Sequence, residues 1–125
     1  MSSRIQRAQE VLAAADAAAD TAAEQCSDTA DAAYALFFVA DDAYTKIPTG
    51  SAVESTPAGD AHIASLWREW RLEVDTYEAA VATHTAAEKV YDAAAEAART
   101  ALIEFNAEVE AFLAATTAAR ANRAK

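Results

Sequence analysis

The side chains best suited to chemistry in this chain are His84 and Glu88, which stand four residues apart and would share one face of a helix. An imidazole and a carboxylate at this spacing can contribute to a metal site in a helical bundle, where other helices supply further carboxylates. Di-iron bundles use Glu-x-x-His pairs, and this sequence contains none. We therefore predict no metal site, no bound cofactor and no catalytic residue.

Other motifs of catalysis are also missing from the sequence. The two glycines, Gly50 and Gly59, do not form a phosphate-binding loop, because no Gly-Lys-Ser/Thr follows them, and there is no Gly-x-Ser-x-Gly. Cys26 is the single cysteine, so it cannot form an internal disulfide, and we interpret it as a small buried apolar residue. The sequence therefore predicts a protein that is not an enzyme.

The densest aromatic cluster is Trp67-Arg68-Glu69-Trp70. If the two tryptophans pack against Leu36, Phe37 and Ala40, they form a hydrophobic plug at one end of a helix pair. The alternative is a recognition surface, because tryptophan often anchors protein interfaces.

The elements that would position these residues are long helices. The chain has 38 alanines, and both glycines and both prolines fall between Pro48 and Gly59. Small or apolar residues recur every third or fourth position of the first half, as in a heptad repeat. We call this line of residues the alanine seam: Ile5, Ala8, Leu12, Ala15, Ala19, Ala22, Cys26, Thr29, Ala33, Leu36, Ala40 and Ala43.

A similar line runs through the second half, and Glu88 interrupts it. Its residues are Ile63, Trp67, Trp70, Val74, Tyr77, Val81, His84, Tyr91, Ala95, Ala98, Leu102, Phe105, Val109 and Phe112. The sequence thus predicts an all-α fold and a single domain, 1–125. It is a long antiparallel hairpin with alanine-rich, coiled-coil-like packing: helix about 3–45, loop about 46–59, and helix about 60–121 capped by Asp60. Alternatively, a break near 83–85 gives a three-helix bundle.

Folding this loop into a hairpin would place Thr45 opposite Asp60 and Ile5 near Thr100, so that later residues have no partner in the first helix. Exposed large apolar side chains forfeit about 1.5–3 kcal/mol each. We therefore predict an interface with a second copy or another protein at the C-terminal part of the second helix: Leu102, Ile103, Phe105, Val109, Phe112 and Leu113. Residues beside the alanine seam would form a second contact face: Val11, Phe37, Val39 and Tyr44.

The formal net charge of −10 argues against nucleic acid as a partner and against anionic membrane surfaces. Eight acids and no base lie between Arg7 and Lys46, which indicates a solvated face or a surface for a basic partner. The longest apolar run, 32–40, is too short to span a bilayer, and the first residues lack the apolar core of a signal peptide. We expect a soluble protein.

The leading functional hypothesis is a non-enzymatic structural or assembly protein, an oligomerising helical hairpin that docks into a larger complex such as a virion, a fibre or a secretion apparatus. A second hypothesis is a small secreted effector that resembles the WXG100 type in its helix–loop–helix architecture, although the loop reads Ile47-Pro48-Thr49-Gly50 in place of Trp-x-Gly. A third is an amphipathic granule coat, similar to phasins in alanine content.

Overall fold

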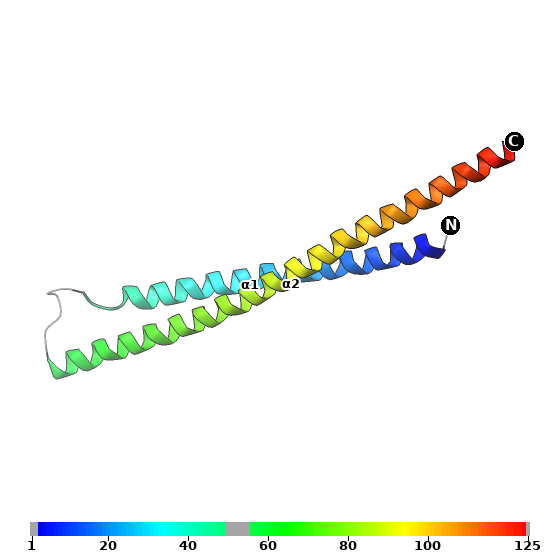
Figure 1. Ribbon diagram of the computed structural model, residues 1–125. Coiled ribbons are helices and arrows are strands. Elements are labelled where there is room, and N and C mark those ends of the chain that lie inside the picture. The colour runs from blue at the N-terminus through cyan, green and yellow to red at the C-terminus, as the bar shows by residue number, and fades with distance from the viewer. Residues whose placement is uncertain (1–2, 50–55, 125) are drawn as a thin grey trace. The chain divides into compact units, whose positions relative to one another are not determined.

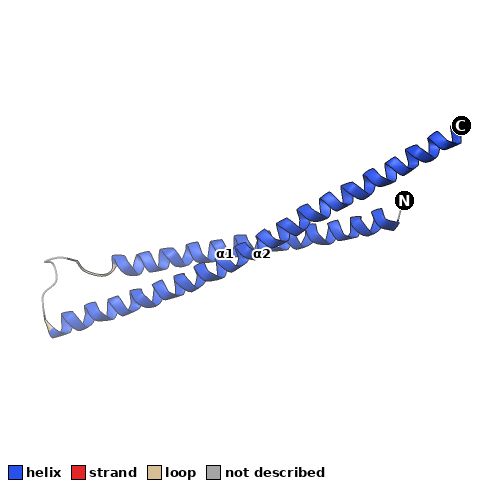
Figure 2. Ribbon diagram, viewed as in Figure 1, coloured by secondary structure: helices blue, strands red, loops and turns tan. Residues whose placement is uncertain are grey.

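The computed structural model describes residues 3–49 and 56–124, and these form two helices (Figure 1). Helix α1 covers Ser3–Thr45 and helix α2 covers Pro57–Ala124. Across these described ranges the chain is helical apart from the residues next to the loop, and it has no strand (Figure 2). The prediction of an all-α fold with two long helices is confirmed. Part of the predicted loop, 50–55, lies outside the described residues.

Helix α2 begins three residues earlier than predicted, and its cap is Thr56, not Asp60. The Thr56 hydroxyl oxygen accepts a hydrogen bond from the Gly59 amide at 3.0 Å, and the Thr56 carbonyl accepts one from the Asp60 amide at 2.8 Å. Pro57 occupies the first helical position, where its missing amide hydrogen costs nothing. Asp60 then lies in the first turn, where its carboxylate complements the helix dipole.

Helix α2 continues through 83–85, where the three-helix alternative requires a break. The hydroxyls of Thr83 and Thr85 donate to the carbonyls of Ala79 and Val81, at 3.1 and 3.0 Å, so both side chains are satisfied within the helix. The structure therefore has one continuous helix at the position where the alternative predicted two.

Contacts along the chain define two compact units, and each contains a piece of both helices. Unit 1 joins Met1–Glu24 with Lys89–Lys125, and unit 2 is Gln25–Glu88. In unit 2 the two pieces are antiparallel, because α1 residues progressively nearer the loop meet α2 residues progressively nearer the loop: Thr29 with His84, Phe37 with Tyr77, and Tyr44 with Trp70.

The sheltered face of α1 is the one that the sequence predicts. All twelve residues of the alanine seam are buried or half-buried, and Ala30 is the one further α1 residue in either class. Among the described residues of the whole chain, only seven are buried, and five of these are alanines. The two large ones are Ile5, in unit 1, and Ile47, just beyond the end of α1. The fully buried positions are therefore mostly small side chains, and most larger ones in the contact are half-buried.

The sheltered face of α2 agrees only partly with the predicted line, of which nine of the fourteen residues are half-buried. A further sheltered set recurs every seven residues, one position before every second residue of that line: Leu66, Glu73, Ala80, Ala87, Ala94, Ala101 and Glu108. The residues that follow four of these are exposed: Trp67, Val81, Glu88 and Leu102.

Four consecutive members of this sheltered set, from Ala80 to Ala101, are alanines. Small side chains fit between helices that approach closely, and the larger ones that follow them lie at the edges of the contact. Because Ala87 is sheltered and Glu88 is not, the glutamate does not interrupt the contact.

The pairing of the two helices also differs from the predicted register. The Tyr44 ring lies 6.4 Å from that of Trp67 and 6.0 Å from that of Trp70, so the end of α1 is opposite this pair and not opposite Asp60. The chain continues past α1 in a turn, in which the Ile47 amide donates to the Tyr44 carbonyl at 3.1 Å. Helix α2 begins at Pro57, earlier in the sequence than predicted. The first turns of α2 therefore precede its contact with α1.

Unit 1 shows the same correction. Arg4, Arg7 and Ala8 line a common hollow with Glu104 and Glu108, so the start of α1 lies beside these glutamates and not near Thr100. The part of α2 without a helix partner is therefore shorter than predicted. We call residues 110–124 the C-terminal segment; all of them are exposed except Thr116, which is half-buried.

Candidate interaction surfaces

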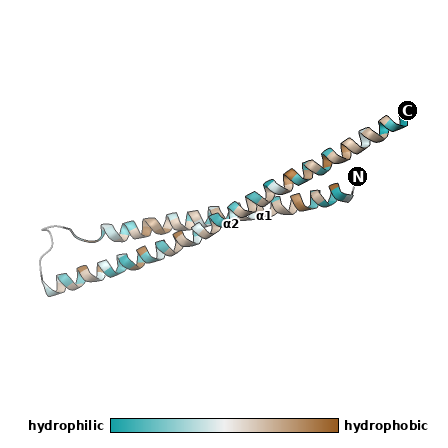
Figure 3. Cartoon of the chain, viewed as in Figure 1, coloured by the Kyte–Doolittle hydropathy of each residue, from teal (hydrophilic) through white to brown (hydrophobic). Residues whose placement is uncertain are grey.

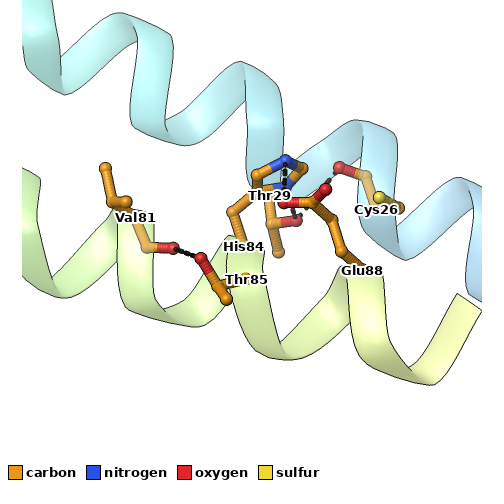
Figure 4. Close-up of polar contacts among 6 residues, drawn as sticks. All are labelled: Cys26, Thr29, Val81, His84, Thr85 and Glu88. Atoms are coloured by element: carbon orange, nitrogen blue, oxygen red, sulfur yellow. Dashed lines mark hydrogen bonds and ion pairs between the residues drawn. The ribbon is translucent and has the colours of Figure 1, made fainter.

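The residues with most scope for chemistry form a polar cluster between the helices of unit 2 (Figure 4). The His84 Nδ1 atom lies 2.9 Å from the Thr29 hydroxyl oxygen, and its Nε2 atom lies 3.2 Å from a carboxylate oxygen of Glu88. The Thr29 hydroxyl also lies 3.0 Å from the Cys26 carbonyl oxygen, to which it donates. The cluster thus links both helices of the unit at one level.

Hydrogen-bond capacity defines what this cluster can do. A hydroxyl group has one proton, so if Thr29 donates it to the Cys26 carbonyl, the His84 Nδ1 atom must donate to Thr29. The Nε2 atom must also donate, because its partner is the Glu88 carboxylate. Both contacts together therefore require a proton on each ring nitrogen. A neutral imidazole satisfies the contact to Thr29 or that to Glu88 as a donor, but not both. Because its contacts join the two helices, the geometry of the cluster suits it to fixing their pairing.

In the described part of the chain, the other elements of a metal centre do not lie near His84 and Glu88. Among residues 3–49 and 56–124 there is no group of three or more His, Cys, Asp or Glu side chains placed to hold an ion. The Cys26 thiol is half-buried and free.

The two tryptophans form an aromatic cluster with a partner that the sequence analysis did not name. Their rings lie 5.5 Å apart at 86°, an edge-to-face arrangement, and both approach Tyr44. Phe37, one of the predicted partners, instead approaches Tyr77 at 5.7 Å. The difference follows from the register, because Phe37 lies two turns farther from the loop than Tyr44. The Arg71 guanidinium lies 5.8 Å over the Trp70 ring.

Two adjoining hollows, of about 310 and 300 Å³, run along one side of unit 2 and share Phe37 and Tyr77. We call them together the aromatic groove. Its α1 wall spans Ala30 to Tyr44 and its α2 wall spans Trp70 to His84. The full lining is Ala30, Ala33, Tyr34, Phe37, Ala40, Asp41, Tyr44, Trp70, Val74, Tyr77, Glu78, Val81 and His84.

The large side chains of this groove remain in contact with solvent. Tyr34 is 65% exposed and Tyr44 is 50% exposed. Tyr34 also contacts Phe38 edge to face, with ring centroids 4.8 Å apart, and extends the apolar surface past the groove.

The sequence predicts only part of this groove. Phe37 and Tyr44 were expected on a second contact face, whereas Tyr34 was not predicted and the α2 wall was expected between the helices. The signal that could have identified that wall is the size of its side chains, because Trp70, Tyr77 and Val81 are too large for all of them to fit between closely approaching helices.

The predicted interface residues all lie in unit 1, and the structure leaves most of them open. Leu102, Ile103, Phe112 and Leu113 are exposed, and Phe105 and Val109 are half-buried. Since the contact with α1 reaches Glu108, Leu102 to Phe105 lie beside α1 and not beyond it, which corrects the reason given for their exposure. Only Phe112 and Leu113 belong to the C-terminal segment.

No helix within the described residues is both long and apolar enough to cross a membrane. Comparison of the chain with models of known protein families, with curated proteins and with solved structures gives no match to any of them.

Proposed function

We propose that this chain is a non-enzymatic structural or assembly protein, a coiled-coil-like helix pair that self-associates or docks into a larger protein complex through its exposed apolar surfaces. The proposal rests on one observation: small side chains occupy the buried positions, and large apolar side chains occupy exposed ones. Within the described residues, the buried positions are mostly alanine, whereas fifteen large apolar side chains are exposed. Hydrophobic residues recur along both helices (Figure 3).

The energetics favour association. Fully burying a large apolar side chain contributes about 1.5–3 kcal/mol. The fifteen exposed ones are 37–68% exposed, so covering each contributes a part of that, and a few together outweigh what one buried alanine contributes. Monomeric proteins rarely leave contiguous apolar patches open, and such patches commonly serve as interfaces. Several of the exposed residues here gather along the aromatic groove, and four more lie between Leu102 and Leu113.

The seven-residue recurrence of sheltered positions on both helices supports the coiled-coil-like character. In an antiparallel pair, the flanking positions of one helix lie beside those of the other, and here both sets carry aromatic or branched residues in unit 2. Helix bundles use such flanks to add further helices.

Size exclusion coupled to light scattering tests the proposal over about two decades of protein concentration, at low and high salt. We expect the mass to exceed that of one chain and to rise with concentration. Ile103→Ser with Leu113→Ser should weaken this association, whereas Leu72→Ser should not, because Leu72 is equally exposed, at 66%, but lies outside both patches. A single-chain mass at every concentration and salt would overturn self-association.

A further inference from the structure

We propose that the C-terminal segment of one copy docks into the aromatic groove of a second copy, as a third helix beside α1 and α2 of unit 2. This inference rests on the proposed self-association and names the two surfaces that meet. It combines an apolar groove without an occupant with a helical segment whose face matches that groove in length, apolar content and charge.

The lengths of the two surfaces agree. The groove extends over fourteen residue steps on each wall, from Ala30 to Tyr44 and from Trp70 to His84. At about 1.5 Å per residue this is about 21 Å. The C-terminal segment, 110–124, also spans fourteen steps and remains helical throughout. Its whole length can therefore lie in the groove.

One face of the C-terminal segment changes from apolar to basic along its length. Phe112, Leu113, Thr116, Arg120 and Arg123 follow one another at helical spacing, so they share a face. Phe112 is 42% exposed and Leu113 is 57% exposed, which leaves both able to insert between aromatic rings. Amphipathic helices bind apolar grooves through residues at this spacing.

The groove changes character in the matching way. Its part near Tyr34 and Val81 is lined by His84 and by apolar and aromatic residues and has no carboxylate, whereas its part near Tyr44 is lined by the carboxylates of Asp41 and Glu78. Neither carboxylate forms an ion pair with another described residue, and the same holds for Arg120 and Arg123. In the sequence, residues 111–125 contain three bases and no acid, although the chain as a whole is strongly acidic.

These two gradients define the direction of docking. Leu113 and Arg120 are seven residues apart, and so are Tyr34 and Asp41. The segment therefore runs parallel to the α1 of its host, with Leu113 beside Tyr34 and Arg120 between Asp41 and Glu78. The contact is heterologous, since groove meets segment. In a pair joined by one such contact, one copy keeps a free groove and the other keeps a free C-terminal segment. Further copies can therefore add head to tail.

The decisive experiment mixes two variants in a light-scattering measurement. Phe37→Glu places a charge in the groove and leaves the segment intact, and Leu113→Glu does the reverse. Each variant alone should associate at least about ten-fold more weakly than the unmodified protein. An equimolar mixture should form a complex of two chains and nothing larger, because one intact groove meets one intact segment. The matched controls are at exposed positions: Ala35→Glu lies outside the groove, and Ala121→Glu lies on the face of the C-terminal segment opposite Phe112.

A charge exchange gives an independent test on exposed residues, where the helices are not perturbed. Arg120→Glu with Arg123→Glu, and separately Asp41→Arg with Glu78→Arg, should each weaken association about ten-fold, and mixing the two should restore it. Circular dichroism confirms that each variant remains helical. If the unmodified protein associates but neither mixture restores association, the docking mode is wrong while the proposed function stands. If the unmodified protein is a single chain throughout, both the docking mode and the proposed self-association are wrong.

Discussion

Ile47 provides the sharpest test of how unit 2 is held together. It is 5% exposed and is one of two large buried residues in the described chain, yet it lies outside both helices. Ile47→Ala removes three carbons, worth about 0.8 kcal/mol each when buried, so the lost transfer free energy is about 2 kcal/mol. A cavity left at the site adds to this loss, so the total is at least about 2 kcal/mol, the lower end of the usual range for such a truncation.

Urea denaturation followed by tryptophan fluorescence measures this loss. The two tryptophans of the chain, Trp67 and Trp70, both belong to unit 2, so the signal reports this unit. With a urea dependence of about 1–3 kcal/mol per molar, a loss of about 2 kcal/mol lowers the midpoint by about 1 M. Because Ile47 is not helical, helix propensity does not contribute to the change.

Leu72→Ala is the matched control, since it also removes three carbons from unit 2, but from a side chain that is 66% exposed. Its effect should stay within about 0.5 kcal/mol. Equal shifts for the two variants, or an unchanged midpoint for Ile47→Ala, would show that the end of α1 does not pack as described. Both measurements use one low protein concentration, so that association does not contribute to the difference.

Two further predictions concern single hydroxyl groups. Thr29→Val keeps the side-chain shape but removes the hydroxyl partner of the half-buried His84 ring, so unit 2 should lose about 1–2 kcal/mol in the same assay, whereas Thr85→Val, whose hydroxyl is exposed, should change little. Thr56→Ala removes the cap of α2 and should cost about 1 kcal/mol, while Thr83→Ala, within the helix, should cost nothing; no difference between these two would remove Thr56 from its capping role.

The sequence was sufficient to predict which face of α1 is sheltered, because only one face of that helix is lined with small and apolar residues along its whole length. Acids occupy the positions outside the alanine seam, as at Asp16, Asp20 and Glu24, so no other face could be turned inward. On helix α2 two neighbouring residues could occupy the same sheltered position, since Ala80 precedes Val81 and Ala101 precedes Leu102. Hydrophobicity alone selects the larger residue of each pair, whereas the close approach of the helices selects the smaller one.

The register between the helices was less predictable for a different reason. Hydrophobic periodicity locates a face on each helix but does not set how far one helix slides along the other, because an alanine-rich seam looks similar after each shift of seven residues. Specific contacts set that distance here: the Thr29 hydroxyl meets His84, and Tyr44 meets the two tryptophans. The candidate groove depends on this register, so neither its lining nor its charge pattern could be predicted before the pairing was known.

Because small side chains are buried and large apolar ones are exposed, the stability of this chain depends on its association. Five of the seven buried residues among those described are alanines, and an alanine side chain contributes about one methyl group of burial, so the pairing of α1 with α2 gains little free energy from each residue. A contact that forms only between folded chains adds to that stability in proportion to the logarithm of protein concentration. The unfolding midpoint of the unmodified protein should therefore rise with concentration. For Leu113→Glu it should rise less, because that variant keeps the alanine seam and loses the exposed apolar contact.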